Sequence, residues 1–199
     1  MISLLSDGWL VADVCSSDAP NVIKHLSIRK RRAPPDKGDL YQSRLMRIRI
    51  PVAVADPDAK VTLEPLCAPE LHGHIIVSLT VNPRRIGRPY RYLYGNCVVG
   101  ARPCNAFNGV CRVDVVDRTV VTWSDAENAV ISGTPVFLPR PHTRHDDETD
   151  GVLLVDELGA DGLSRFVFLH ARTFVEVARV VIPFRHTLSS GTTWVWAGD

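Results

Sequence analysis

Two strand-like runs meet at Asn82-Pro83-Arg84-Arg85-Ile86-Gly87-Arg88-Pro89-Tyr90-Arg91-Tyr92-Leu93-Tyr94-Gly95. The first run is 75–81 and the second is 90–94, and the glycine and prolines between them predict a turn. Tyr90, Tyr92 and Tyr94 recur with period two, so their rings are expected on one face of a strand. A stripe of this kind most often packs in a core with its hydroxyl groups satisfied at the rim.

Short apolar or alternating runs recur along the whole chain, and most are separated by Gly, Pro, Asp or Asn. They are 9–15, 44–50, 61–66, 75–81, 90–94, 110–116, 119–123, 135–138, 151–158, 164–170, 174–182 and 192–196. Many short strands with almost no helical periodicity predict an all-β sandwich, barrel or propeller of antiparallel strands. We expect at most one helical turn, within 19–26, and a loop over 29–38.

One strand and two hairpins make this prediction specific. In 44–50, Met46, Ile48 and Ile50 alternate with Arg47 and Arg49, as is typical of a half-buried antiparallel strand. A first hairpin is expected to turn at Asp117-Arg118. The Asp-Gly pair within 159–162 is expected to join 151–158 to 164–170 in a second hairpin.

Composition allows one domain over 1–199, because 199 residues with 45% hydrophobic content can bury a core. A net charge of +1 favours neither nucleic acid nor an anionic membrane surface. No apolar run reaches 18 residues and no secretory leader is evident, so we expect a cytoplasmic protein. The basic loop 29–38 is either a solvated connection or a patch that touches anionic lipid or acts as a localisation signal.

The five cysteines are odd in number, and no two have the short spacing of a zinc knuckle. We therefore expect reduced thiols in the cytosol. Cys97, Cys104 and Cys111 are evenly separated, but seven-residue gaps match poorly to a zinc site.

The histidines form no complete metal site by spacing alone. His72 and His74 would share a strand face beside Glu70, but two ligands without a nearby third hold iron or zinc poorly. The segment 142–151 is more often a solvated acidic turn than a calcium loop, because its carboxylates lack the required alternation. No nucleophile elbow and no glycine-rich loop opening onto a helix is present.

A family resemblance extends the interpretation beyond an all-β domain. The stretch 82–95 is similar to the segment "N-P/Y … G-R/K-P-Y-R-Y-x-Y-G" of the carotenoid cleavage oxygenases, a non-haem iron family that includes carotene oxygenases and retinoid isomerases. Further segments resemble that family in its own order. They are 7–15, 43–50, 107–114, 133–141 followed by 146–147 and 151–154, and 174–183. Each match is weak alone, but the ordered set is specific.

The resemblance implies a seven-bladed β-propeller with one Fe2+ on its axis, held by four histidines of which three are backed by glutamates. Oxygen cleaves a double bond of a carotenoid or retinoid beside the iron in that family. Backing carboxylates fix the imidazole tautomer and keep the ligand basic. Residues 1–199 would correspond to about three C-terminal blades of such a propeller.

The chain departs from the family pattern at each position that can be compared. Ser190 or Gly191 occupies the place of the last histidine ligand, and Thr134 and Val77 stand where the family has glutamates. His186 is a poor substitute, because reaching the axis would need a shift of four or five residues and an odd shift reverses the strand face. The other ligands would lie upstream of Met1.

The sequence therefore predicts part of a carotenoid cleavage dioxygenase that by itself has no catalytic or metal site and binds no iron. The alternative is a non-catalytic β-domain that binds a lipid or a protein partner. We also expect the isolated chain to self-associate, because a propeller cut part-way has unpaired strand edges and an uncovered blade face.

Overall fold

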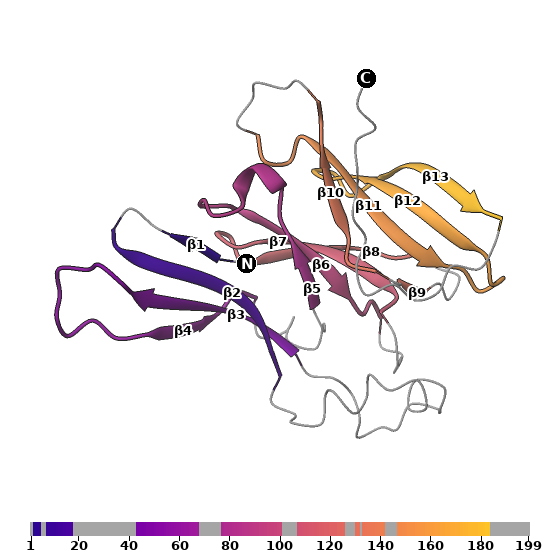
Figure 1. The fold of residues 1–199 in the computed structure, drawn as a ribbon. Helices are drawn as coiled ribbons and strands as arrows, with labels where there is room; N and C mark the ends of the chain where they lie inside the picture. Colours follow the sequence, from indigo (N-terminus) through magenta and orange to yellow (C-terminus); the bar gives the residue numbers. More distant parts are fainter. Residues whose placement is uncertain are drawn as a thin grey trace.

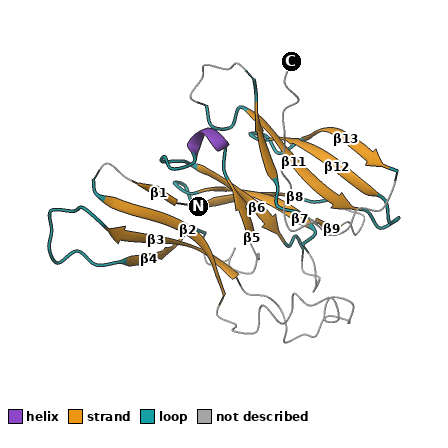
Figure 2. Ribbon diagram, viewed as in Figure 1, coloured by secondary structure: helices purple, strands orange, loops and turns teal. Residues whose placement is uncertain are grey.

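The protein is an all-β molecule over the part of the chain that the computed structural model describes. That part comprises residues 2–4, 7–17, 43–67, 77–100, 107–125, 130–131, 133–141 and 147–183. Its strands are β1 (Ile2–Leu4), β2 (Trp9–Ser17), β3 (Ser43–Pro51), β4 (Thr62–Pro65), β5 (Val77–Thr80), β6 (Tyr92–Cys97), β7 (Gly109–Asp114), β8 (Thr119–Trp123), β9 (Val130–Ile131), β10 (Val136–Pro139), β11 (Gly151–Leu158), β12 (Ser164–His170) and β13 (Glu176–Ile182). One 3-10 turn, η2 (Pro83–Arg85), lies between β5 and β6 (Figure 2).

The strands form three antiparallel sheets, each built largely from consecutive strands (Figure 1). The first sheet has the order β1-β2-β3-β4 and the second β5-β6-β7-β8. The third has the order β10-β11-β12-β13, with the short β9 also paired to β11. No helix within the described residues is long and apolar enough to cross a membrane.

Turn chemistry and alternation predicted most strand boundaries well. The expected runs 119–123, 151–158 and 164–170 coincide with β8, β11 and β12. Both predicted hairpins are confirmed, since Asp114 pairs with Thr119 and Leu158 with Ser164. The run 192–196, the helical turn within 19–26 and the basic loop 29–38 lie outside the described residues.

The second sheet lies between the other two and is covered on both faces (Figure 1). On one face, Leu93 and Val113 join a core cluster with Leu45 and Leu66 of the first sheet and the residues that follow it. On the other face, Tyr94 packs with Phe137 and neighbouring apolar residues of the third sheet. The two cores share the β6–β7 ladder, so consecutive residues of β6 point into different cores.

The tyrosine stripe divides between these two cores, which corrects the prediction that all three rings share one face. Tyr92 and Tyr94 lie in β6 and face the third sheet. Tyr90 precedes β6, directly after Pro89, and its ring packs on the opposite side with the first sheet. The Tyr94 hydroxyl donates to the Ala171 carbonyl at 3.5 Å.

The strand β3 also departs from the usual arrangement, in which the apolar face of a strand points inward. Met46, Ile48 and Ile50 do share one face, but the arginine face of β3 is the one turned to the second sheet. Leu45, on the arginine face, is only 3% exposed within the first core. A charged side chain on an inward face requires a partner, and Arg47 has one in Asp13.

The Asp13 carboxylate ties the first sheet to the second. Arg47, in the adjacent strand β3, donates two hydrogen bonds of 2.8 Å to this carboxylate, one from Nε and one from Nη2. Tyr90, in the segment just before β6 of the second sheet, donates its hydroxyl to Asp13 Oδ2, and the two oxygens lie 2.5 Å apart. Burial and the Asp13 charge raise the pKa of Tyr90, so its hydroxyl remains a donor.

We predict that Arg47→Met destabilises the fold by about 3–5 kcal/mol, because it removes the positive charge that balances the fully buried Asp13. Urea unfolding followed by tryptophan fluorescence measures this loss. The control is Arg118→Met, which breaks the exposed 3.0 Å pair with Glu64 and should cost about 0–1 kcal/mol. Equal losses in the two variants would contradict the assigned role of Asp13.

Candidate functional site

The structure brings together the two positions at which the resemblance implies glutamates. Val77, in β5, is the ladder partner of Asn96 in β6. Asn96 in turn donates its side-chain Nδ2 to the carbonyl oxygen of Gly133 at 2.8 Å, and Thr134 is the next residue. Asn96 therefore joins the two positions across the junction of the second and third sheets.

Asn96 was not singled out by the sequence, although it is a buried polar group of this junction. It is only 3% exposed, and its Oδ1 has no hydrogen-bond partner among the described residues. A buried acceptor without a partner costs about 1–3 kcal/mol, so such groups usually have a role or a ligand. Its position in Tyr-Leu-Tyr-Gly-Asn-Cys resembles a strand end, so the sequence carries no signal for it.

The described residues of this junction do not fit an iron centre. Val77 and Thr134 offer no carboxylate, and the Asn96 amide is neutral. Within the described ranges, no group of three His, Cys, Asp or Glu side chains could hold a metal ion. The described histidine is His170, whose Nδ1 accepts from the Thr173 backbone at 3.3 Å.

The remaining sequence candidates for ligands lie outside the described residues. These are Ser190, Gly191 and His186, the pair His72 and His74 with Glu70, and Cys104. The acidic segment 142–151 is described only from Asp147 onward, where Asp147 accepts hydrogen bonds from Thr149 and pairs with Arg172. Its described part is thus a turn closed by its own contacts.

The described cysteines gather in the first core and form no disulfide. Cys97 and Cys111 are both 0% exposed, and a hydrogen bond between their thiols, together with burial, raises the pKa of Cys111. Burial likewise raises the pKa values of Cys15 and Cys67 to about 11. The thiol form is neither a good nucleophile nor a good metal ligand, so these cysteines act as apolar core residues.

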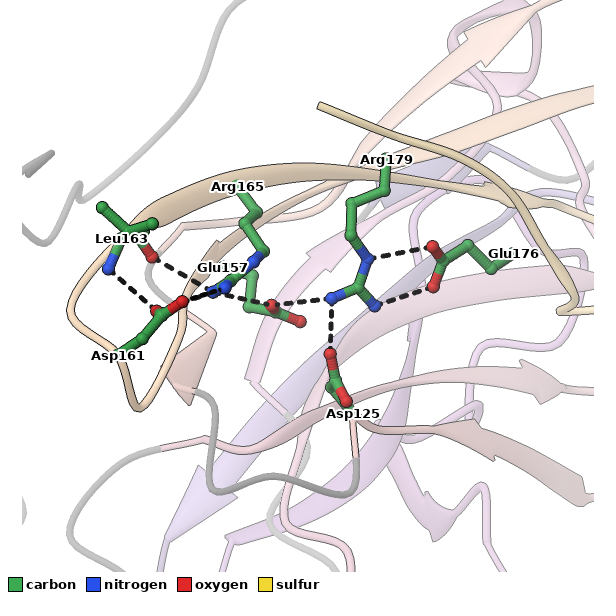
Figure 3. Close-up of polar contacts among 7 residues, drawn as sticks. All are labelled: Asp125, Glu157, Asp161, Leu163, Arg165, Glu176 and Arg179. Atoms are coloured by element: carbon green, nitrogen blue, oxygen red, sulfur yellow. Dashed lines mark hydrogen bonds and ion pairs between the residues drawn. The ribbon is translucent and has the colours of Figure 1, made fainter. Parts of the chain in front are cut away.

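A second polar site lies on the third sheet, at the end of β11 that pairs with β9 (Figure 3). Arg179 of β13 makes a two-point contact with Glu176, at 2.9 and 2.8 Å, and also donates to Asp125 Oδ2 at 2.6 Å. Arg165 of β12 pairs with Asp161 in the β11–β12 turn. A cavity of about 90 Å³ lies among these side chains.

Glu157 of β11 is the buried centre of this cluster. It is 1% exposed, and its Oε1 lies 3.4 Å from Arg179 Nη1 and 3.9 Å from Arg165 Nη1. Its Oε2 has no hydrogen-bond partner among the described residues. Burial raises the pKa of Glu157 and the Arg179 charge opposes that rise only in part. The cluster connects the third sheet to Asp125, which follows β8.

Comparison with known proteins gives a consistent result over nearly the whole chain. The model of the retinal pigment epithelial membrane protein family matches residues 6–195. Carotenoid cleavage dioxygenase 8 homolog B of Oryza sativa subsp. japonica is 33% identical over 188 residues, which are 94% of this chain and 31% of that protein. Carotenoid cleavage dioxygenase 8 of Arabidopsis thaliana is 32% identical over 88% of this chain and 29% of its own length. Both names carry the word chloroplastic.

Solved structures show the same fold. A variant of Synechocystis apocarotenoid oxygenase superposes with a TM-score of 0.78 at 23% identity, covering 97% of this chain and 38% of that one. The cobalt-substituted form of the Synechocystis enzyme gives a TM-score of 0.75 at 24% identity. The chain thus spans about a third of the length of the curated relatives that it matches.

We predict that Glu157→Gln stabilises the fold at pH 7. The pKa of Glu157 is higher in the folded chain than its ordinary 4.5, so the folded state binds the proton more tightly than the unfolded state. Stability from this group is therefore present at acidic pH and is lost as pH rises through the folded pKa. Glutamine stays neutral and avoids that loss.

The measurement is urea unfolding of both proteins between pH 4.5 and 8. The difference between them should grow with pH and vanish near the acidic end. Glu64→Gln, on the exposed edge of the first sheet, is the matched control and should change stability by less than about 0.5 kcal/mol. A Glu157→Gln variant that is less stable than the parent at pH 8 would show that the pairing with Arg179 outweighs burial.

Proposed function

The chain belongs to the retinal pigment epithelial membrane protein family, the carotenoid cleavage oxygenases, and on that premise we propose that it is part of a carotenoid cleavage dioxygenase. The observation that carries this proposal is the family match over residues 6–195. The matched plant proteins are named as carotenoid cleavage dioxygenases. We therefore propose a carotenoid or apocarotenoid as the substrate of the complete enzyme, with oxygen as the second reactant.

We propose that residues 1–199 form about three C-terminal blades of a seven-bladed β-propeller. Three antiparallel sheets in chain order, stacked face to face, support this arrangement. In propellers each blade is a sheet of about four strands that packs on its neighbours around an axis. The junction of Val77, Asn96 and Thr134 would then lie toward the axis.

We propose that the 199-residue chain by itself neither holds catalytic iron nor cleaves a carotenoid. A ferrous ion bound by imidazoles would supply the oxygen chemistry in a complete enzyme of this family. In this chain Val77, Asn96 and Thr134 cannot provide the charged partner that orients such an imidazole. Loss of one such partner typically lowers metal affinity or activity by about 10- to 100-fold.

The second candidate function is a non-catalytic β-domain that binds a lipid or a protein partner. The neutral amide of Asn96 between two positions without carboxylates favours it. Contact of the segment 29–38 with an anionic membrane surface and a cytoplasmic location remain predictions, which vesicle flotation and cell fractionation would test.

We predict that anaerobic loading with ferrous iron, followed by desalting, leaves far less than one iron per chain. Incubation of the loaded protein with a carotenoid in air should give no apocarotenal above the buffer control, measured by chromatography. The matched variant is His186→Ala. If the parent chain binds nearly one iron and His186→Ala binds none, His186 is a ligand. If both proteins bind iron tightly, the metal is held by other residues.

A further inference from the structure

The face of the first sheet that points away from the second sheet is mostly apolar. Strand alternation places on it every residue of β2, β3 and β4 that is out of phase with Asp13 and Arg47. These are Leu10, Ala12, Val14, Ser16, Arg44, Met46, Ile48, Ile50, Leu63 and Pro65. Leu63 is 60% exposed, and the residues 46, 48 and 50 are partly exposed. We call this surface the first outer face.

The third sheet repeats the pattern at the opposite end of the stack. Its outward residues are those out of phase with Glu157, Arg165 and Arg179. They are Val136, Leu138, Val152, Leu154, Asp156, Leu158, Ser164, Phe166, Phe168, His170, Ala178, Val180 and Ile182. Val180 is 51% exposed and both phenylalanines are partly exposed, whereas Leu154, Asp156 and Ser164 are buried at 4%, 4% and 1% exposure. We call this surface the second outer face.

The two outer faces invert the pattern of a sheet at the surface of a protein. An antiparallel sheet usually packs its apolar face inward and shows polar side chains to water. Here the charged clusters of Asp13 and Glu157 lie on the inward faces, and most residues of the outward faces are apolar. The polar exceptions are Ser16 and Arg44 on the first outer face and Asp156, Ser164 and His170 on the second. Large contiguous apolar patches on a soluble chain mark sites of association.

The direction of the stack indicates what fits on these faces. Within the chain, the first sheet packs on the second and the second on the third, in one continuing order. A further sheet that carries the apolar face of the first sheet could pack on the second outer face and so continue the stack. A second copy of this chain carries that sheet, and the net charge of +1 gives little long-range repulsion between copies.

We propose that the 199-residue chain associates head to tail, with the first outer face of one copy packed on the second outer face of another. This inference rests on the two faces and is independent of iron binding or carotenoid cleavage. Such an interface joins two different surfaces, so it forms rings if the rotation closes and open chains if it does not. The weight-average mass should therefore rise with protein concentration above the monomer value of 22.0 kDa.

The test uses one charged substitution in the centre of each face, Ile48→Glu and Phe168→Glu, with sedimentation equilibrium as the measurement. Each variant alone lacks one half of the contact in every copy, so both should remain monomeric. A 1:1 mixture contains one intact face of each kind, so it should form a dimer of twice the monomer mass and nothing larger. Val116→Glu, at a turn residue that is 65% exposed, should associate like the parent chain.

Circular dichroism establishes that each variant is folded. If a central substitution unfolds the chain, Leu63→Glu and Val180→Glu provide a second pair at positions of the same two faces that are 60% and 51% exposed. Self-association of the Phe168→Glu variant would show pairing between two first outer faces, and that of Ile48→Glu pairing between two second outer faces. Either result, or a parent chain that is monomeric at all concentrations, would overturn the proposal.

Discussion

Burial of both faces of the second sheet is the constraint on which the rest of this structure depends. Successive residues of β6 point into different cores, so Leu93 and Tyr94 must each find a separate partner sheet. The Tyr94 ring centroid lies 5.5 Å from that of Phe137 in β10 and 6.3 Å from that of Phe174 in the β12–β13 connection. The first sheet closes the other side and is held by the Tyr90 hydroxyl on Asp13. Removal of either outer sheet would expose one apolar side of the middle one.

The sequence predicts the strands of this fold because alternation and turn residues act locally. The Asp-Gly turn near Asp161 and the alternation of 164–170 need no knowledge of the rest of the chain. The inward direction of the Arg47 side chain could not be predicted in this way, because the alternation of β3 does not show which of its two faces packs on the second sheet. The position of the buried Asp13 decides it, and that residue lies 34 positions away in the sequence. Which charged side chains lie on an inner face depends on tertiary contacts.

The candidate site shows the same limit. Resemblance identified Val77 and Thr134 as positions of interest, but it gave no reason to look at Asn96, which links them. Nothing in the sequence was a reason to group Glu157, Arg165 and Arg179, since each lies in a different strand-like run and looks like a surface charge. Only the pairing of β11, β12 and β13 brings these three side chains together. A buried carboxylate between two guanidinium groups fixes the alignment of these strands more than it suggests chemistry.

The reduced cysteines of the first core have a practical consequence for the study of motion in this molecule. Cys97 and Cys111 come from the second sheet and lie in the core that it shares with the first. Both are fully buried, so a thiol reagent can reach them only when the two sheets separate or the chain unfolds. The rate of their alkylation under native conditions therefore reports how often the first sheet detaches or the chain unfolds. Alkylation of these two native thiols can be used to follow that opening without an added label.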